Sequence, residues 1–361
     1  MTIEYATALD IGNRKRQAGG INEDSIAVSV LEDGHLDTDR QAGIFVLADG
    51  AGGEEAGEIA SYIASVEVAR GLTERAWESR CFAGGRSGIP ASDRGRRLDE
   101  SAAVSSLGSA DPERILAWID AAIQEAHTHI LECVRDLELG SAYSTVVAGV
   151  VVDDRLYFGW VGDSRIYIVT AQPEAATDEI SQLTRDHSVV ERMVQRGEID
   201  PVEAHVHRKG TQITRALDGT IEDAAEQRSV EVDTNSVRLF AEDTVLFTSD
   251  GLIDANIDAP TLHEEYLQTE GSSSIERSIL EKSVTDDEIR DVVIDAESLE
   301  AAAGAFVTLA NQRGGKDNVS IILVQNPTLS SLPPEGPPGR AFNRSFDAVD
   351  DATTVIGDPE H

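Results

Sequence analysis

An apolar run meets an acid and a glycine-rich turn in the stretch Gly43-Ile44-Phe45-Val46-Leu47-Ala48-Asp49-Gly50-Ala51-Gly52-Gly53. The run is typical of a buried strand, and residues 54–61 after it are typical of a helix. The carboxylate of Asp49 therefore leaves a strand end where glycine lets the backbone turn tightly. Beside a carbonyl that glycine leaves uncovered, it suits a hard cation with oxygen ligands. An ordinary Asp-Gly turn is the alternative interpretation.

The same combination of acid, glycine and apolar β-run recurs at Asp163, Asp250 and Asp317. Acids at the strand ends of a layered sheet can converge on one cleft, where their repulsion calls for cations. Oxygen ligands without a cysteine or histidine set indicate Mg²⁺ or Mn²⁺ rather than Zn²⁺. Two such ions bridged by a carboxylate can activate water and hydrolyse a phosphate monoester directly. The alternative is four unrelated Asp-Gly turns.

Composition narrows the class of protein. The chain has 361 residues, 66 acidic and 30 basic side chains, and a net charge of −36. Such acidity argues against nucleic acid or an anionic membrane as a partner. Because self-repulsion destabilises a compact acidic protein unless salt screens it, and lysine is scarce, we predict an origin in a high-salt organism. No apolar run approaches the ~20 residues of a membrane span, so we predict a cytoplasmic protein.

Periodicity divides the chain into a core and three variable segments. We expect one domain over residues 1–327, followed by a disordered acidic tail over 328–361. Within the domain, residues 79–109 lack periodicity and predict a mobile insertion, while 258–300 predict an acidic, mostly helical segment. Strands are expected at 3–10, 25–31, 43–49, 145–152, 156–161, 165–170, 244–249 and 319–324, and the main helices at 58–72, 111–134 and 301–312.

Several ordered motifs resemble those of the metal-dependent serine/threonine protein phosphatases, the PPM or protein phosphatase 2C family, above all its bacterial-type members. The resemblance spans residues 3–325 and is carried by Asn22-Glu23-Asp24-Ser25, Ala48 to Gly53, Gly162-Asp163-Ser164-Arg165, Leu183 to Ser188, Thr214-Arg215-Ala216-Leu217, Ser249-Asp250-Gly251-Leu252 and Lys316 to Ser320. It implies an α+β fold, a four-layer αββα sandwich of two antiparallel sheets flanked by helices. It also implies phosphoserine and phosphothreonine hydrolysis by water bridging two Mn²⁺ or Mg²⁺ ions.

Mapped residue by residue, the resemblance implies that Asp49 bridges both metal ions and that the Gly50 carbonyl binds one of them. Glu23 or Asp24 would serve that same ion through water. These four residues come from two neighbouring predicted strands, so we expect them at one edge of a sheet.

The resemblance assigns the second ion to Asp250 and Asp317. It assigns a weaker third site to Asp163 and Asp254, which falls four residues after Asp250 as in the family. Asn318 would support these ligands or bind water linked to the metal.

The phosphate-binding arginine is harder to assign, because the loop before Asn22 is longer than in the family. Arg16 is the preferred residue and Arg14 the alternative, since the planar guanidinium matches two phosphate oxygens. Ala51 stands where eukaryotic relatives have a proposed acid histidine. His187 is expected to fix the segment beside the cleft rather than to donate a proton.

The resemblance also implies partners. Phosphorylated proteins and a cognate serine/threonine kinase are expected, with residues 186–215 forming a flap that helps to choose substrates. In the tail, Thr353 and Thr354 follow acids and could be phosphorylated and read by a phosphothreonine-binding module, although an unmodified tail is the alternative. Two other functions remain open: an inactive phosphoprotein-binding regulator of the same fold, and a hydrolase of small phosphate esters with a deep closed pocket.

Overall fold

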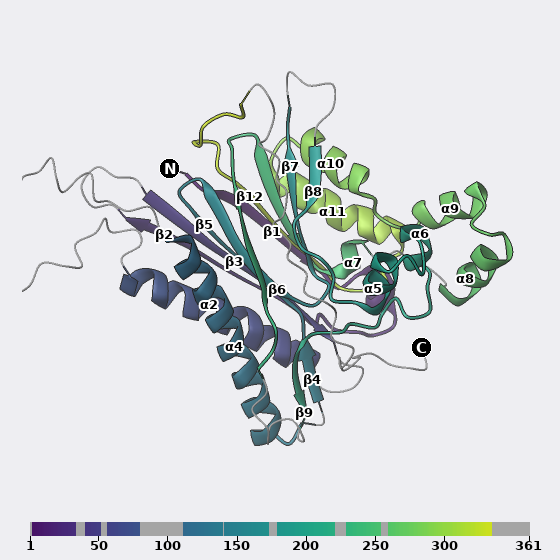
Figure 1. Ribbon diagram of the computed structural model, residues 1–361, viewed down its shortest axis with the longest axis horizontal. Coiled ribbons are helices and arrows are strands. Elements are labelled where there is room, and N and C mark those ends of the chain that lie inside the picture. Colours follow the sequence, from purple (N-terminus) through teal and green to yellow (C-terminus); the bar gives the residue numbers. More distant parts are fainter. Residues whose placement is uncertain are drawn as a thin grey trace, which may run out of the picture.

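The computed structural model describes residues 2–33, 40–51, 56–79, 111–139, 141–172, 179–220, 229–253 and 259–333. Two antiparallel sheets pack face to face, with helices on both outer sides (Figure 1). This is the predicted α+β sandwich. Most of the predicted insertion and tail, together with Asp254, Thr353 and Thr354, lies outside the described residues.

One sheet has five strands and is built around the C-terminal part of the domain. Its spatial order is β1, β12, β11, β7 and β8, with the bounds Glu4–Asp10, Val319–Gln325, Asp243–Thr248, Arg165–Thr170 and Glu179–Gln182. Strands β11 and β12 are antiparallel neighbours, so the end of β11 and the start of β12 lie at the same edge of the sheet.

The other sheet has seven strands and contains the apolar run that ends at Asp49. Six of its strands lie in the order β10 (Asp233–Arg238), β6 (Arg155–Val161), β5 (Val146–Val152), β3 (Arg40–Ala51), β4 (Ser141–Ser144) and β9 (Leu217–Thr220). The seventh strand, β2 (Asp24–Asp33), also pairs with β3. Because β2 and β3 are antiparallel, the start of β2 lies beside the end of β3.

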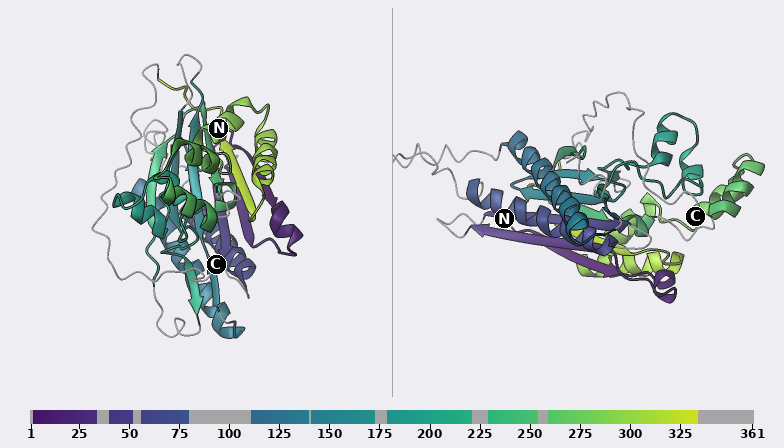
Figure 2. Two further views of the ribbon diagram at one scale, coloured as in Figure 1. Left: turned by 90° about the vertical axis from the view of Figure 1, so that its right-hand side faces the viewer. Right: turned by 90° about the horizontal axis from the view of Figure 1, so that it is seen from below.

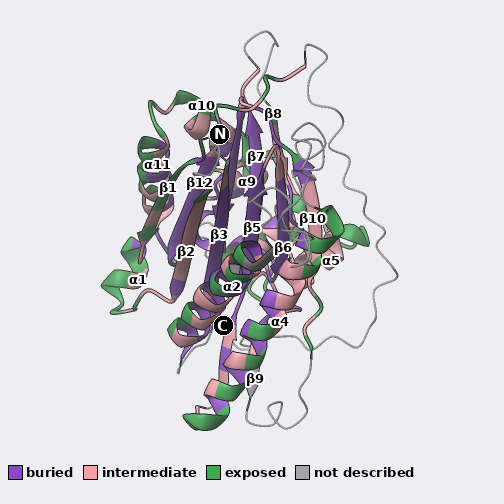
Figure 3. Cartoon of the chain, turned by 90° about the vertical axis from the view of Figure 1, so that its left-hand side faces the viewer, coloured by how far each residue is buried: buried purple, intermediate pink, exposed green. Residues whose placement is uncertain are grey.

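Alternate side chains of β3 enter two different cores. Phe45 and Leu47 pack between the sheets, while Ile44 and Val46 pack under helices α2 (Gly57–Ser79) and α4 (Pro112–Asp136). Burial on both faces explains why this strand is a continuous apolar run rather than an alternating one. Figure 3 shows the strands as mostly buried and α4 as exposed along its outer face.

The opposite layer consists of α7 (Asp250–Ile253), α10 (Asp286–Asp295) and α11 (Leu299–Arg313), which cover the five-stranded sheet. Five smaller helices complete the described part: α1 (Asn13–Gln17), α5 (Val189–Gln195), α6 (Pro201–Ala204), α8 (Ala259–Gln268) and α9 (Ser273–Leu280). Figure 2 shows α8 and α9 projecting from one end of the sandwich, next to the segment that contains α5 and α6.

Four strands have no counterpart among those predicted from the sequence, namely β4, β8, β9 and β10, and the last three lie at an edge of their sheets. The residues of β8 and β10 are mostly half-buried, as the sequences Glu-Ile-Ser-Gln and Asp-Thr-Asn-Ser-Val-Arg suggest. An edge strand packs fewer of its side chains, so its apolar alternation is weak. Among the described helices, none is both long and apolar enough to cross a membrane.

Candidate active site

Five acidic residues gather where the strand ends of the two sheets meet. Asp24 lies opposite Asp49 across the β2–β3 pair. Asp250 follows the end of β11, and Asp317 precedes the start of the neighbouring strand β12. Asp163 occupies the turn between β6 and β7, which carries the chain from one sheet to the other. Each acid therefore reaches this edge because the antiparallel order of the strands brings it there.

The backbone around Asp49 is held by a hydroxyl chain. The Asp49 N–H donates to Thr145 Oγ1 at 3.2 Å, and the Thr145 N–H donates to the Asp49 carbonyl at 2.8 Å. Thr145 Oγ1 also lies 2.7 Å from Ser164 Oγ, beside Asp163. These bonds fix the end of β3 to the β6–β7 turn, so Asp49 and Asp163 belong to one rigid corner.

The carboxylate of Asp24 is buried and only half satisfied. Ser249 Oγ and Ser320 Oγ donate to its Oδ2 at 2.8 and 2.6 Å, whereas its buried Oδ1 accepts no hydrogen bond from the described residues. Burial raises the pKa of Asp24 to about 6, although the two serines oppose this, and the charge of Asp317 adds to the increase. An unsatisfied buried carboxylate oxygen is the kind of atom that a cation or ordered water completes.

Electrostatic repulsion concentrates on Asp49. Burial raises the pKa of its carboxyl well above the ordinary value, and the negative charges of Asp24, Asp250, Asp317 and Asp163 raise it further. Cations at this edge would remove that repulsion.

The width of the acidic cluster also bears on the kind of ion. Among the described residues, no three of these carboxylates offer oxygens that all lie within 4.8 Å of one another. Mg²⁺ and Mn²⁺ accept oxygen ligands, and Mg²⁺ usually keeps several waters and takes one or two carboxylates. The residues present therefore fit hard divalent ions that are partly coordinated by water.

Two glycines of the site permit backbone contacts that a side chain would block. A Cβ on Gly50 would lie 2.2 Å from the Gly57 carbonyl oxygen, and one on Gly251 would lie 1.9 Å from the Asn318 carbonyl oxygen. These glycines, which the sequence analysis associated with turns, bring the Asp49 and Asp250 segments against their neighbours.

Lys15 enters the acidic cluster, which the sequence analysis did not anticipate. Its Nζ lies 2.8 Å from Glu23 Oε2, 2.7 Å from Asp317 Oδ1 and 2.8 Å from Asn318 Oδ1. Burial opposes its charge, but the carboxylates of Asp317 and Glu23 outweigh burial and raise the pKa of Lys15. The only sequence signal was a cation in a loop, shared with the arginines on either side.

Asn318 ties the connection between β1 and β2 to the start of β12. Its Oδ1 accepts the Glu23 N–H at 2.8 Å, and its Nδ2 donates to the carbonyls of Ile11 and Ile21 at 3.2 and 3.1 Å. The side chain of Asn318 therefore holds the backbone of Glu23 in place, and Lys15 Nζ contacts Asn318 Oδ1 as well.

The two candidate arginines point in different directions. The segment expected to be a loop forms the short helix α1, and side chains two positions apart on a helix, such as Arg14 and Arg16, are turned about 200° from one another. Arg16, the preferred candidate, places its guanidinium 2.8 Å from Asp10 Oδ2 and is half exposed. Arg14 lines a cavity that Asp163 and Asp250 also line. The helix thus directs Arg14 toward the cleft.

This cavity has a volume of about 940 Å³ and lies between the acidic edge, the predicted flap and the start of α10. The base of the flap is clamped by backbone bonds between His187 and its neighbours: the His187 N–H donates to the Gly162 carbonyl at 2.9 Å, and the Thr214 N–H donates to the His187 carbonyl. The flap therefore forms one wall of the cavity from a fixed base.

The ring of His187 is part of the same clamp. Its Nδ1 accepts the Gly162 N–H at 3.0 Å, and its Nε2 lies 3.2 Å from Asp233 Oδ2. Burial lowers the pKa of His187, so the neutral ring is favoured. A ring engaged in this way positions the flap, in agreement with the role expected from the sequence.

Comparison with known proteins gives a family and several relatives. The family model described as "Protein phosphatase 2C" matches residues 11–268. The serine/threonine phosphatase stp of Listeria welshimeri is 28% identical over 283 residues, which are 78% of this chain and 84% of the relative. Protein phosphatase PhpP of Streptococcus pneumoniae is 24% identical over 336 residues, 89% of this chain and 97% of the relative.

Solved structures share the fold. The Mycobacterium tuberculosis serine/threonine phosphatase PstP/Ppp has a TM-score of 0.57 at 24% identity and covers 90% of this chain and 99% of its own. The catalytic domain of the protein phosphatase PstP, solved in complex with two manganese ions, has a TM-score of 0.52 at 23% identity. The match covers 90% of this chain and 97% of that structure's chain.

Proposed function

The chain belongs to the protein phosphatase 2C family and is a metal-dependent serine/threonine protein phosphatase, and we propose that the acidic cluster around Asp49 is its catalytic centre. The observation that carries this proposal is the convergence of Asp24, Asp49, Asp163, Asp250 and Asp317 at one edge of the sandwich. The substrates that we propose are phosphoserine and phosphothreonine side chains of proteins.

We assign the metal ligands by position in the cluster. Asp49 and the Gly50 carbonyl would hold one Mn²⁺ or Mg²⁺ ion, and Glu23 or Asp24 would contact that ion through water. Asp250 and Asp317 would hold the other ion. When bound, such ions would supply Lewis acidity, which lowers the pKa of water and neutralises phosphoryl oxygens.

A third, weaker site would use Asp163, together with Asp254 outside the described residues. Asn318 supports the ligand set through its bond to the Glu23 backbone. We favour two resident ions because relatives of this fold include a structure with two manganese ions.

Arg14 is the residue that we assign to the substrate's phosphate. It faces the cavity together with Asp163 and Asp250, and a guanidinium can bind two phosphate oxygens at once. Arg16 already pairs with Asp10 and holds the start of α1. We do not assign His187 as a proton donor, because its ring is hydrogen-bonded at the base of the flap.

The wider setting is proposed from family membership. We propose phosphoproteins as partners, a serine/threonine kinase that supplies them, a cytoplasmic location and a catalytic domain over residues 1–327. The cavity wall formed by the flap and α10 suits a peptide segment better than a fully enclosed small ester. A phosphothreonine reader at Thr353 or Thr354 remains a proposal about residues beyond those described.

The test is a phosphatase assay on a phosphothreonine peptide with Mn²⁺ titrated into metal-free protein. Wild type should require the metal, and Asp250→Asn should lose at least a hundredfold in kcat/KM. The matched control is Glu113→Gln, which removes an exposed acid from the far helix α4 and should behave as wild type. Activity without metal, or an Asp250→Asn enzyme as active as wild type, would overturn the assignment. A metal-binding but inactive wild type would favour the phosphoprotein-binding regulator.

A further inference from the structure

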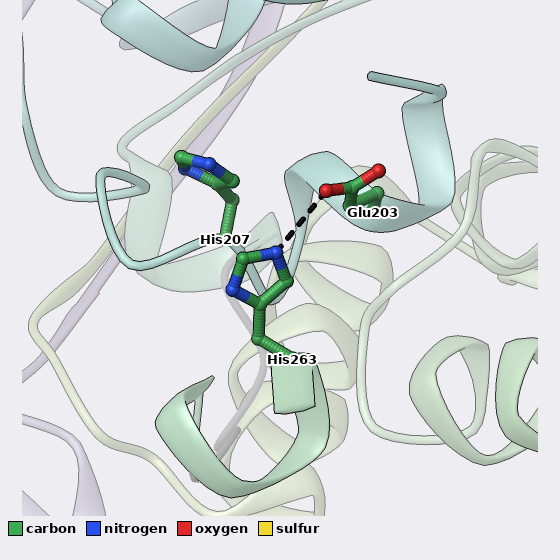
Figure 4. Close-up of side chains that lie close together, drawn as sticks. All are labelled: Glu203, His207 and His263. Carbon is green, nitrogen blue, oxygen red and sulfur yellow. Dashed lines mark hydrogen bonds and ion pairs between the residues drawn. The ribbon is translucent and has the colours of Figure 1, made fainter. Parts of the chain in front are cut away.

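A second group of metal-ligating side chains lies away from the acidic cluster. Glu203, His207 and His263 each offer one ligand atom, and these atoms lie within 4.8 Å of one another (Figure 4). His263 Nε2 is 3.1 Å from Glu203 Oε1, and the two imidazole rings meet edge to face with centroids 4.8 Å apart. Within the described part of the chain, no other cluster of three such residues is as close.

The three residues come from two segments far apart in the sequence. Glu203 lies on α6 in the flap and His207 just beyond it, whereas His263 lies on α8. The contact therefore joins the flap to the helical segment that follows the catalytic core. Neither segment could form the group alone.

The backbones that present these side chains are fixed independently of them. The side chain of Asp200 caps α6 by accepting the N–H groups of Val202 and Glu203 at 2.8 and 3.0 Å. Tyr266, one turn beyond His263 on α8, donates its hydroxyl to the same aspartate. A small apolar core lies beneath: Val206, Leu262, Tyr266, Ile275 and Ile279. Ligands held on a supported frame bind a metal ion with little reorganisation.

The chemistry of the group differs from that of the acidic cluster. Two imidazoles and one carboxylate are the ligand set of zinc sites that keep a fourth position for water. At bond lengths of about 2.0–2.1 Å, tetrahedral ligand atoms lie roughly 3.4 Å apart. The pair Glu203–His263 already meets this spacing, so His207 has only a short distance to close.

We propose that Glu203, His207 and His263 form a binding site for a divalent transition-metal ion of the zinc class, which fastens the flap to α8. His207 also lines the cavity beside the acidic edge, so the ion would hold one wall of the substrate cleft in place. The site is separate from the ions used in hydrolysis and is selective by ligand type, since imidazole suits Zn²⁺ better than Mg²⁺.

Two existing interactions must yield when the ion binds. The contact between His263 Nε2 and Glu203 Oε1 gives way to bonds from both atoms to the ion, and the 3.2 Å bond from the Lys209 N–H to His207 Nδ1 is replaced or weakened. Burial lowers the pKa of His207, and the neighbouring His263, Lys209 and Arg208 act in the same direction against the charge of Glu203, which favours the neutral ring that can ligate a metal ion. The simpler alternative is a Glu–His ion pair with a second histidine packed on it.

The test uses the full chain, stripped of metal and then saturated with Mg²⁺ to occupy the acidic cluster. Co²⁺ serves as a spectroscopic probe and Zn²⁺ as the ligand in calorimetry. Wild type should bind one equivalent of either ion and give visible bands of tetrahedral Co²⁺. Glu203→Gln and His263→Ala should each weaken Zn²⁺ binding at least tenfold and remove the bands. The matched control is His129→Ala, which breaks another Glu–His pair, 3.2 Å to Glu67, and should bind as wild type.

Two measurements keep the result separate from catalysis and folding. Asp250→Asn should lose phosphatase activity but keep the Zn²⁺ equivalent, whereas His263→Ala should keep its Mg²⁺-supported fold, measured by circular dichroism. Zn²⁺ should raise Tm in wild type and Asp250→Asn but not in His263→Ala. The proposal would be overturned if wild type bound no Zn²⁺ or Co²⁺ other than ions that replace Mg²⁺ in the acidic cluster. It would also be overturned if the variants bound Zn²⁺ as tightly as wild type does.

Discussion

The ammonium group of Lys15 lies 2.7 Å from Asp317 Oδ1 and 2.8 Å from Glu23 Oε2, inside the acidic cluster. It neutralises carboxylates that we assign to the metal ions. A resident cation and an incoming one compete for the same oxygens, because both are attracted by the same negative potential. Lys15 should therefore lower the affinity of the chain for metal while stabilising the metal-free fold.

Replacing this cation should separate the two effects. We expect Lys15→Met to tighten Mn²⁺ binding roughly tenfold, on the order of 1.4 kcal/mol, as measured by calorimetry. The same change should lower Tm in chelator, because the carboxylates lose their partner. Arg16→Met is the control, since it removes an equal charge from the same helix but one that pairs with Asp10. Equal Mn²⁺ affinities in all three proteins would contradict the competition.

The orientation of α1 predicts unequal roles for its two arginines. Arg14→Ala should raise KM for a phosphopeptide and the inhibition constant of inorganic phosphate about tenfold or more, because a bidentate contact is lost. Arg16→Ala should change both by less than about threefold, with any loss appearing in stability. Steady-state kinetics with phosphate as inhibitor checks this, and a larger effect at Arg16 would reverse the assignment.

The raised pKa of Asp24 predicts the pH dependence of the metal-free protein. A carboxyl whose pKa rises from 3.8 to about 6 on folding binds protons more tightly in the folded state. The contribution of Asp24 to the free energy of unfolding is fully present below about pH 4 and is lost as the pH rises through about 6. The total loss is up to about 3 kcal/mol, of which about 1 kcal/mol falls between pH 5 and 7.

Urea unfolding in chelator should therefore show wild type losing stability over this range more steeply than Asp24→Asn. Saturating Mn²⁺ should flatten the wild-type curve, since the ion replaces the proton. Parallel curves for wild type and variant would show that Asp24 does not carry the effect.

The contact between Gly251 and Asn318 predicts a large penalty for one added methyl group. Gly251→Ala would bring Cβ within 1.9 Å of the Asn318 carbonyl oxygen, so the backbone must shift. We expect a loss of about 3 kcal/mol or more in the free energy of unfolding. Gly304→Ala, in the exposed interior of α11 with nothing within 4 Å, should instead stabilise by about 0.5–1 kcal/mol. Denaturant titration compares the two.

The net charge of −36 predicts a strong response to salt. Raising KCl from about 0.1 M to about 1 M shortens the screening length from ~10 Å to ~3 Å and relieves repulsion. Tm should rise by about 5 °C or more, and a sucrose solution of matched water activity controls for effects other than charge. A Tm that falls with salt would contradict adaptation to high salt.

The strand-end acids were recognisable in the sequence because each follows or precedes an apolar run beside glycine. The same pattern predicted that Asp49, Asp250 and Asp317 could converge, whereas the sandwich was implied by the resemblance of the ordered motifs to the protein phosphatase 2C family. Strand burial and turn chemistry are local features, because they depend on residues within a few positions of one another. The edge strands β8 and β10 escaped because fewer of their side chains are packed.

Long-range packing governed the rest. Lys15 and Arg16 are neighbours of equal charge, and a single helical turn directs one into the acidic cluster and the other to Asp10. Glu203 and His263 meet only because α8 packs on the flap through a small apolar core. A linear pattern carries charge and hydrophobicity at each position, whereas the direction of a side chain and its distant partner depend on how whole elements dock.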